Sequence, residues 1–204
     1  AAGDGCGAIR EGLGASGERA AALSIKEHTG GRQVYDDYAH HPEELRALLT
    51  MAQSLGYGRV ICAFQPHTYS RTHELFSDFV EVLKLPDQVL LAEIFAARET
   101  DTLGISSKDL ADRIPGAEYC PTLEDVTDRL AQLAQPGDLL LTVGAGDIHL
   151  AGEHLLRWYA DNHGIDSRGI RPTWSGAQPY QRPDHAIYDG ACGFHRQRRR
   201  GARR

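Results

Sequence analysis

Three short and almost uninterrupted apolar runs restrict the fold of this chain more than any other feature. They are RVICAF (residues 59–64), QVLLAEI (residues 88–94) and DLLLTV (residues 138–143). Strands of a parallel sheet have this pattern when helices cover both faces of the sheet. We expect a further strand in QVYDDY (residues 33–38), which becomes more polar towards its end.

Helix-length amphipathic segments separate these runs. The first follows Pro42, a favourable residue for a first helical turn, and Glu43 and Glu44 suit the positive end of a helix. Further helices are expected after Thr72, after Ser106 or Ser107, after the capping box TLED (residues 122–125) and over residues 147–159. Alternating strands and helices predict an α/β fold, with a doubly wound, mostly parallel sheet and helices on both faces.

The chain divides into three expected regions. Residues 1–31 are rich in glycine and alanine without a clean period and form a lead-in segment, and residues 32–159 form the regular domain. Residues 160–204 contain no leucine, valine or lysine but many arginines, a composition that cannot build a core, so we expect this tail to be disordered. The tail is either a nucleic-acid-binding arm or a segment without evolved function, and we favour the second reading, which makes nucleic acid an improbable partner.

Several classes of protein do not fit the composition. The chain has no run of eighteen apolar residues, so we expect no membrane span. Its four cysteines are scattered without a CxxC pair, which speaks against a zinc site or a redox dithiol and favours a cytoplasmic protein. The single methionine is Met51, so we expect a processed chain or a piece of a longer one.

Polar clusters follow each predicted strand at its carboxyl end. These clusters are DDYAHHP, QPHTYSRT, FAARE and GAGD. Because ligands bind beyond the carboxyl ends of the strands in an open parallel sheet, we expect one rim that gathers these side chains. Its titratable and aromatic members are Asp36, Asp37, His40, His41, His67, Tyr69, Arg71, Arg98 and Asp147.

Each cluster has a competing interpretation. His40 and His41 are adjacent, and no HxH or HxxxH spacing supports a metal site, so we expect none. Ser70 is not on a GxSxG elbow and is better read as a helix cap than as a nucleophile. Arg71 could form a fork for a carboxylate or phosphate, or it could simply pair with Glu74 on the surface.

The sequence lacks a phosphate-binding loop, which limits how this chain could handle ATP. The three lysines are Lys26, Lys84 and Lys108, and none lies in a GxxxxGK[ST] loop. If the chain handles ATP, another domain must therefore supply the phosphate-binding loop and most of the Mg²⁺ site.

The segments VYDDYAHHPEEL, FQPHTYSRTHELF, AEIFAARE and TVGAGDI, in this order and spacing, resemble the C-terminal domain of the Mur ligase family. The first two point to the members that add L-alanine to UDP-N-acetylmuramic acid. The resemblance implies a Rossmann-like domain of a cytoplasmic, ATP- and Mg²⁺-dependent carbon–nitrogen ligase of peptidoglycan synthesis. In such a ligase an acyl phosphate reacts with the amine, and the N-terminal and central domains are absent from this chain.

The resemblance also implies roles for individual residues. Asp37 corresponds to the aspartate that faces the nucleotide, and Tyr38, His40, His67 and Arg71 correspond to the wall that receives L-alanine. His40 or His41 would position the amine as the catalytic residue. A fragment of this kind should not catalyse ligation alone. A stand-alone module that binds a small carboxylate or nucleotide remains the alternative.

Overall fold

The computed structural model describes residues 24–29, 31–101 and 103–162. Along the chain the elements are β1 (Ser24–Thr29), β2 (Arg32–Asp37), α2 (Pro42–Ser54), β3 (Arg59–Phe64), α3 (Tyr69–Glu74), α4 (Phe76–Val82), β4 (Gln88–Ala92), α5 (Ser107–Ala111), β5 (Glu118–Cys120), α6 (Leu123–Leu133), β6 (Asp138–Val143) and α7 (His149–Asn162). The expected C-terminal tail lies outside the described residues from residue 163 onward.

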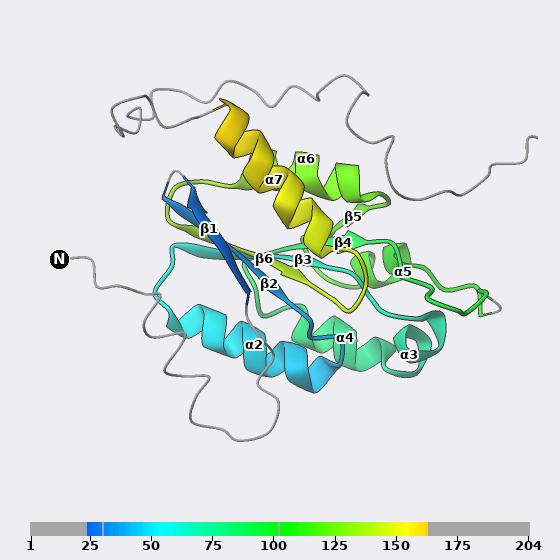
Figure 1. Cartoon of the computed structure of the whole chain (residues 1–204). Helices are drawn as coiled ribbons and strands as arrows, with labels where there is room; N and C mark the ends of the chain where they lie inside the picture. Colours follow the sequence, from blue (N-terminus) through cyan, green and yellow to red (C-terminus); the bar gives the residue numbers. More distant parts are fainter. Residues whose placement is uncertain (1–23, 30, 102, 163–204) are drawn as a thin grey trace, which may run out of the picture.

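One sheet of six strands organises these elements, in the order β1-β2-β6-β3-β4-β5. The strands from β2 to β5 in this order are parallel to one another, and β1 pairs with β2 in the antiparallel direction. Helices α2 and α4 lie on one face of the sheet and α6 and α7 on the other (Figure 1). The predicted doubly wound α/β class is therefore confirmed.

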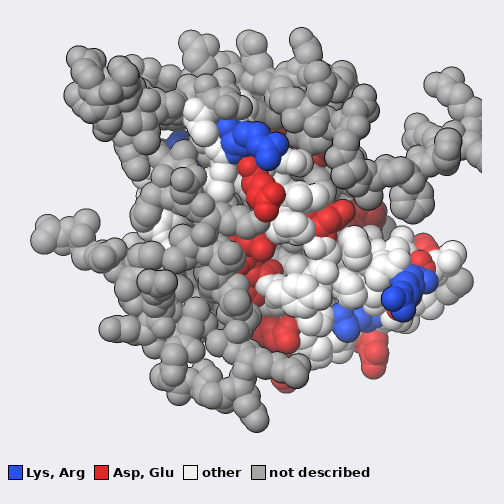
Figure 2. All heavy atoms as spheres, viewed as in Figure 1, with Lys and Arg blue, Asp and Glu red and all other residues white. Residues whose placement is uncertain are grey.

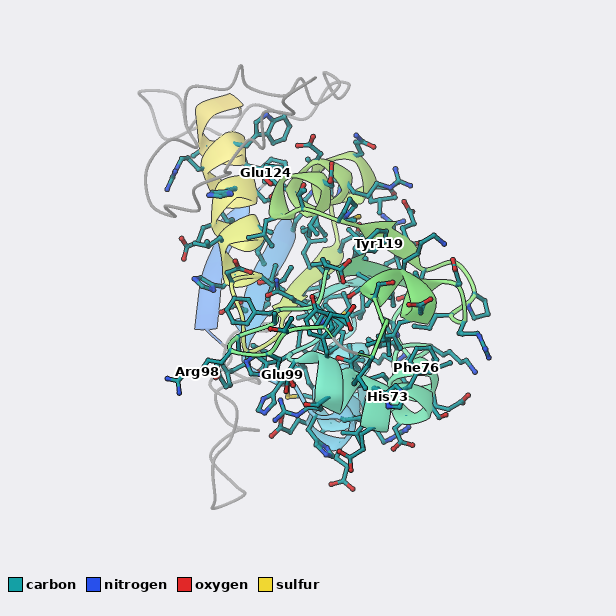
Figure 3. All side chains as sticks on the ribbon, turned by 90° about the vertical axis from the view of Figure 1, so that its right-hand side faces the viewer. His73, Phe76, Arg98, Glu99, Tyr119 and Glu124 are labelled. Atoms are coloured by element: carbon teal, nitrogen blue, oxygen red, sulfur yellow. The ribbon has the colours of Figure 1, made fainter. Side chains whose placement is uncertain are left out.

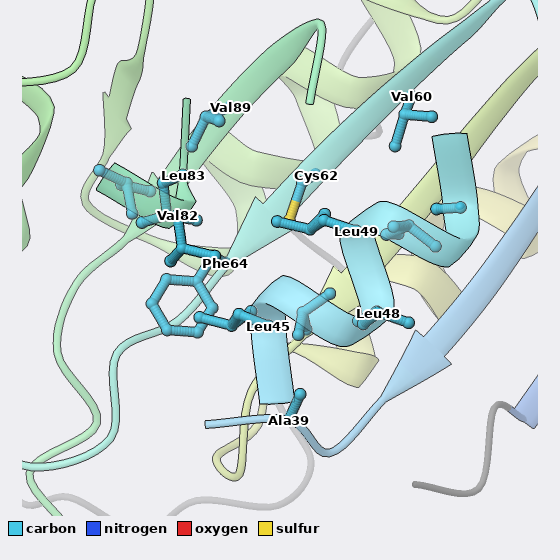
Figure 4. Close-up of a cluster of buried hydrophobic side chains, with 14 of the residues drawn as sticks. Ala39, Leu45, Leu48, Leu49, Val60, Cys62, Phe64, Val82, Leu83 and Val89 are labelled. Carbon is cyan, nitrogen blue, oxygen red and sulfur yellow. The ribbon is translucent and has the colours of Figure 1, made fainter. Parts of the chain in front are cut away.

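The apolar runs are continuous because a central strand contributes side chains to a hydrophobic core on each face of the sheet. In β3, Cys62 and Phe64 contribute to the core under α2 and α4, whereas Ile61 and Ala63 contribute to the core under α6 and α7. Figure 4 shows the first of these cores, with Leu45 and Leu49 of α2 beside Phe64 and Cys62 of β3. Burial of one such leucine side chain stabilises the folded state by about 2 kcal/mol.

The structure contains two strands that the sequence did not predict. β1 belongs to the sheet although it lies in the segment expected as a lead-in, so the sheet begins before residue 32. β5 was not expected at all, because its three residues at the edge of the sheet are too few to produce a pattern.

The helix expected after Thr72 also differs. Thr72 does not cap it but lies buried inside α3, where its hydroxyl donates to the Thr68 carbonyl. A break at Leu75, which ends α3 and precedes α4, divides the segment into two short helices. In contrast, the capping box at Thr122 and Asp125 and the start of α2 at Pro42 are confirmed.

Within the described residues, no helix is long and apolar enough to cross a membrane.

Candidate functional site

The carboxyl ends of β2, β3, β4 and β6 meet at one edge of the sheet, as predicted from the parallel arrangement. The loops that follow these strands also bond to one another. Gln65, directly after β3, is 5% exposed, and its Oε1 accepts from the backbone N–H groups of Asp147 and Ile148 at 2.9 and 3.1 Å. Its Nε2 donates to Asp147 Oδ1 at 2.7 Å. The Gln65 side chain thus fixes the loop between β6 and α7.

Glycine residues in that loop serve close packing within the protein. A Cβ at Gly146 would lie 2.3 Å from Gln65 Oε1 and 2.7 Å from Phe95 Cγ. A Cβ at Gly144 would lie 2.6 Å from the Gln65 carbonyl oxygen. The small residues of GAGD (residues 144–147) therefore allow close contacts inside the protein.

The four residues expected to receive the amino acid come together. The ring centroids of Tyr38 and His40 are 5.5 Å apart, and those of His40 and His67 are 6.0 Å apart. Arg71 Nη1 lies 3.2 Å from His67 Nδ1. The cluster of Tyr38, His40, His67 and Arg71, called the His67 cluster below, joins the β2–α2 loop to the β3–α3 loop.

Tyr38 forms the outer side of this cluster. Its side chain is 63% exposed, which makes it one of the exposed large hydrophobic residues of the described chain. An exposed aromatic ring beside imidazole and guanidinium groups offers an apolar surface to a small ligand.

The two adjacent histidines have different surroundings. His41 is the N-cap of α2, and its Nδ1 accepts from the Glu43 backbone N–H at 3.5 Å, while the Glu44 carboxylate accepts from the His40 and His41 backbone N–H groups. His40 instead lies against Tyr38 and His67, with Nδ1 3.5 Å from Glu44 Oε2. Of the two predicted catalytic residues, His40 is therefore the one in the His67 cluster.

The charge state of His67 follows from its neighbours. Burial, the Arg71 guanidinium and His40 lower the pKa of His67, against a smaller opposite effect of Glu99. Because a guanidinium can only donate, Nδ1 of His67 accepts from Arg71, and the proton of the neutral ring resides on Nε2. The pair then presents only hydrogen-bond donors to a ligand.

Asp37 lies deeper than the His67 cluster. It is 1% exposed; its Oδ1 accepts from the Ala39 backbone N–H at 2.8 Å, whereas Oδ2 is buried without a hydrogen-bond partner. Burial raises the pKa of Asp37, partly offset by the bond from Ala39, and nearby Asp36 and Glu44 raise it further. An unpartnered buried carboxylate oxygen costs about 1–3 kcal/mol or more, so this oxygen would gain from a donor.

Other members of the expected rim have structural roles or stand apart. Asp36 Oδ1 accepts from the Thr142 hydroxyl at 2.9 Å. Figure 3 shows Arg98 projecting away from the fold beside Glu99, and its side chain is exposed. Tyr69 begins α3, and burial raises its pKa, as do the charges of Glu93 and Asp101.

Figure 2 shows acidic side chains spread down the middle of the visible face, with separate basic ones among them.

Sequence reasoning missed the role of the loop after β4. Glu99 accepts from the Ser70 backbone N–H at 2.9 Å and from the Ser70 hydroxyl at 2.5 Å, so Ser70 is held by Glu99 and does not cap a helix. These bonds lower the pKa of Glu99. The hydrogen-bond acceptor in the first turn of α3 is thus the Glu99 carboxylate. Arg71 contacts His67, a neighbour that neither of its two expected roles named.

The described residues contain no group of three or more histidine, cysteine, aspartate or glutamate side chains that could hold a metal ion. Asp36 accepts from the Thr142 hydroxyl, and Asp37 is buried.

The sequence is similar to those of several proteins that share one name. The protein named UDP-N-acetylmuramate–L-alanine ligase from Lachnospira eligens is 53% identical over 131 residues, which are 62% of this chain and 28% of that protein. The protein of the same name from Agathobacter rectalis is 46% identical over 139 residues, or 66% of this chain and 30% of that protein. The chain thus spans less than a third of the length of these relatives.

Solved structures show the same fold. The UDP-N-acetylmuramate–alanine ligase from Thermotoga maritima is 26% identical with a TM-score of 0.54, over 69% of this chain and 30% of that one. A domain of a putative ligase from Haemophilus ducreyi is 23% identical with a TM-score of 0.52, and the match covers 68% of this chain and 99% of that domain, which supports the fold alone. Residues 23–146 match the family described as "Mur ligase, glutamate ligase domain", and the chain belongs to this family.

Proposed function

We propose that this chain is the C-terminal domain of an ATP-dependent ligase that joins L-alanine to UDP-N-acetylmuramic acid in the bacterial cytoplasm. The relatives at 46–53% identity carry the name of that ligase. The single observation that supports the proposal most is the His67 cluster, in which Arg71 lies 3.2 Å from His67 beside His40 and Tyr38. An arginine paired with a neutral imidazole suits the carboxylate of an amino acid.

The donors of the cluster suggest how alanine is oriented. The α-carboxylate accepts from the Arg71 guanidinium and from Nε2–H of His67, and the small methyl group lies towards Tyr38. The amine then lies on the side of His40. As the amine nitrogen attacks the carbonyl carbon of the acyl phosphate, His40 takes up its proton, the new C–N bond forms and the C–O bond to phosphate breaks.

Asp37 is the residue that we propose for the nucleotide. Its Oδ2 is buried without a hydrogen-bond partner, and a hydroxyl or amino group of ATP would supply the missing donor. Because Asp37 is only 1% exposed, this contact requires its surroundings to open. In this proposal other domains of the complete ligase hold Mg²⁺ and the phosphates of ATP, since the 204 residues contain no phosphate-binding loop.

Within the complete ligase, the domain acts by positioning. It closes over the acyl phosphate, holds the amine within reach of the carbonyl carbon and excludes water from the reactive anhydride. The 204 residues contain no GxxxxGK[ST] phosphate-binding loop, so we expect no ligation from them alone.

A chimera tests this function. Residues 24–162 replace the matching segment of the Lachnospira eligens ligase, and phosphate release is measured with ATP, UDP-N-acetylmuramic acid and L-alanine. The chimera should release phosphate in a manner that depends on L-alanine, and the 204-residue chain alone should release none. Turnover by the chain alone, or a folded chimera that accepts UDP-N-acetylmuramic acid and ATP but not L-alanine, would contradict the proposal.

A further inference from the structure

Phe95 follows β4 and holds the segment that carries His67. Its backbone N–H donates to the Pro66 carbonyl at 2.9 Å, and its carbonyl accepts from the Thr68 N–H at 3.0 Å. These two bonds enclose His67 between them and form an isolated parallel bridge of His67 with Phe95. The backbone of His67 is thus fixed by a residue that lies 28 positions later in the chain.

The Phe95 side chain adds a second restraint. Its ring is stacked on the His67 imidazole, with centroids 5.7 Å apart and an angle of 18° between the planes. A stacked ring restricts rotation of the imidazole about χ2, which otherwise is a soft torsion. Phe95 is also packed closely against Gly146, because a Cβ at that glycine would lie 2.8 Å from Phe95 Cβ and 2.7 Å from its Cγ.

The backbone of this region is strained where the two loops meet. Thr68 has φ of 68° and Ala97 has φ of 52°, both in the left-handed region that non-glycine residues rarely adopt. Each such residue costs about 1 kcal/mol or more and persists where its surroundings enforce it. The bond from Thr68 N–H to the Phe95 carbonyl is one such restraint, and it lies directly beside His67.

We propose that Phe95 is a positioning residue, which holds the His67 imidazole in the orientation that accepts from Arg71 through Nδ1 and offers Nε2–H to the carboxylate of the incoming amino acid. Gly146 packs closely against Phe95, and Gln65 holds the adjacent Asp147 backbone, so the β6–α7 loop contributes to the same orientation. The inference about the ligand rests on the function proposed above, whereas the inference about the ring does not.

The ring of His67 reports on this role directly. Long-range ¹H–¹⁵N NMR spectra of the 204-residue chain identify the tautomer of each neutral imidazole and follow its titration. In Phe95→Leu the stacked surface is lost, so His67 should become a mixture of both neutral tautomers and should be protonated at higher pH. Phe95→Tyr retains the stacked ring and should keep the Nε2–H form.

A matched control is available in α4. Phe76→Leu makes the same chemical change at a half-buried phenylalanine of that helix, and it should leave the His67 signals unchanged. Gly146→Ala tests the support behind Phe95, because the added Cβ must displace the phenylalanine ring, and it should shift His67 in the same direction as Phe95→Leu.

The outcomes separate the two inferences. A folded Phe95→Leu protein whose His67 tautomer and titration match the wild type would overturn the positioning role, whatever the function of the chain. If His67 changes as expected, the substitution is then placed in the chimera. There the KM for L-alanine should rise about tenfold or more with Phe95→Leu but not with Phe76→Leu, in line with about 1.4 kcal/mol for a tenfold change. An altered His67 with an unchanged KM for L-alanine would support the positioning of the ring and contradict the proposed ligand.

Discussion

Arg71 Nη1 lies 3.2 Å from Nδ1 of His67, which is four residues earlier in the chain. A guanidinium can only donate, so this contact determines the tautomer of the neutral imidazole. Burial, with the charge of Arg71 as a further cause, lowers the pKa of His67. The two side chains, which the sequence places at the start of a helix and in the loop before it, therefore act as one unit with donors directed towards a ligand.

The pH dependence of His67 follows from this contact. Because burial and Arg71 lower the pKa of His67 below its usual 6.5, the unfolded chain binds the proton first as the pH falls. The stability that neutral His67 contributes is fully present above about pH 6.5 and is lost as the pH falls through the lowered pKa of the folded state. In Arg71→Met the pKa of His67 should rise, as measured by NMR titration. A pKa that is unchanged by this substitution would show that Arg71 does not contact His67 in solution.

His41 should behave as a helix cap. His41→Ala removes the acceptor at the N-cap of α2 and should lower the free energy of unfolding by about 1 kcal/mol, whereas His41→Asn supplies a favourable capping side chain and should restore it. Urea denaturation of both variants measures the difference. Equal loss of stability in the two variants would mean that the cap does not stabilise α2.

Glu99 should control the local stability of α3. Glu99→Ala removes the acceptor for the Ser70 backbone N–H and hydroxyl, so exchange of the Ser70 amide hydrogen with solvent should become faster. Glu74→Ala is the control, because this exposed glutamate lies on the same helix. The bonds from Ser70 lower the pKa of Glu99. The two hydrogen bonds between Ser70 and Glu99 should therefore persist as the pH falls to the usual carboxyl pKa of 4.5 and should be lost below it. Protection of Ser70 that is the same in both variants would contradict the role of Glu99.

Two glycines without a positive φ form a matched pair. Gly146→Ala places a Cβ 2.3 Å from Gln65 Oε1, whereas Gly58→Ala places one 3.6 Å from the Gly137 carbonyl oxygen, an ordinary contact. Gly146→Ala should therefore lower the free energy of unfolding by about 1–3 kcal/mol. Gly58→Ala should change it little or raise it by a few tenths of a kcal/mol, because alanine restricts the unfolded chain. Equal effects of the two substitutions in thermal unfolding would refute the tight packing around Gly146.

The sequence predicted the central elements because local patterns specify them. β3 and β6 are buried on both faces and therefore read as apolar runs, and the box at Thr122 and Asp125 marks the start of α6. β1 and β5 left no such signal, since they lie at the two edges of the sheet and are polar or short. Their positions depend on pairing with distant strands.

The sequence predicted which residues form the candidate site but not what each of them does there. The polar residues after each strand identified His40, His67 and Arg71, because parallel strands bring their carboxyl ends together. Phe95 and Glu99 were overlooked, because each acts on the β3–α3 loop through a contact across about thirty residues, which no local spacing reveals. Their identities as an aromatic and an acidic residue in a loop are compatible with many other roles.

The most direct test of the account is the effect of Arg71→Met on the KM for L-alanine in the chimera, compared with Arg98→Met at the exposed arginine after β4. Loss of a charge-assisted contact worth about 1.5–3 kcal/mol should raise the KM for L-alanine by about 10- to 150-fold in Arg71→Met. The KM for ATP should stay unchanged, and Arg98→Met should alter neither value. A rise in the KM for ATP with no change for L-alanine would contradict the assignment of the His67 cluster to the amino acid.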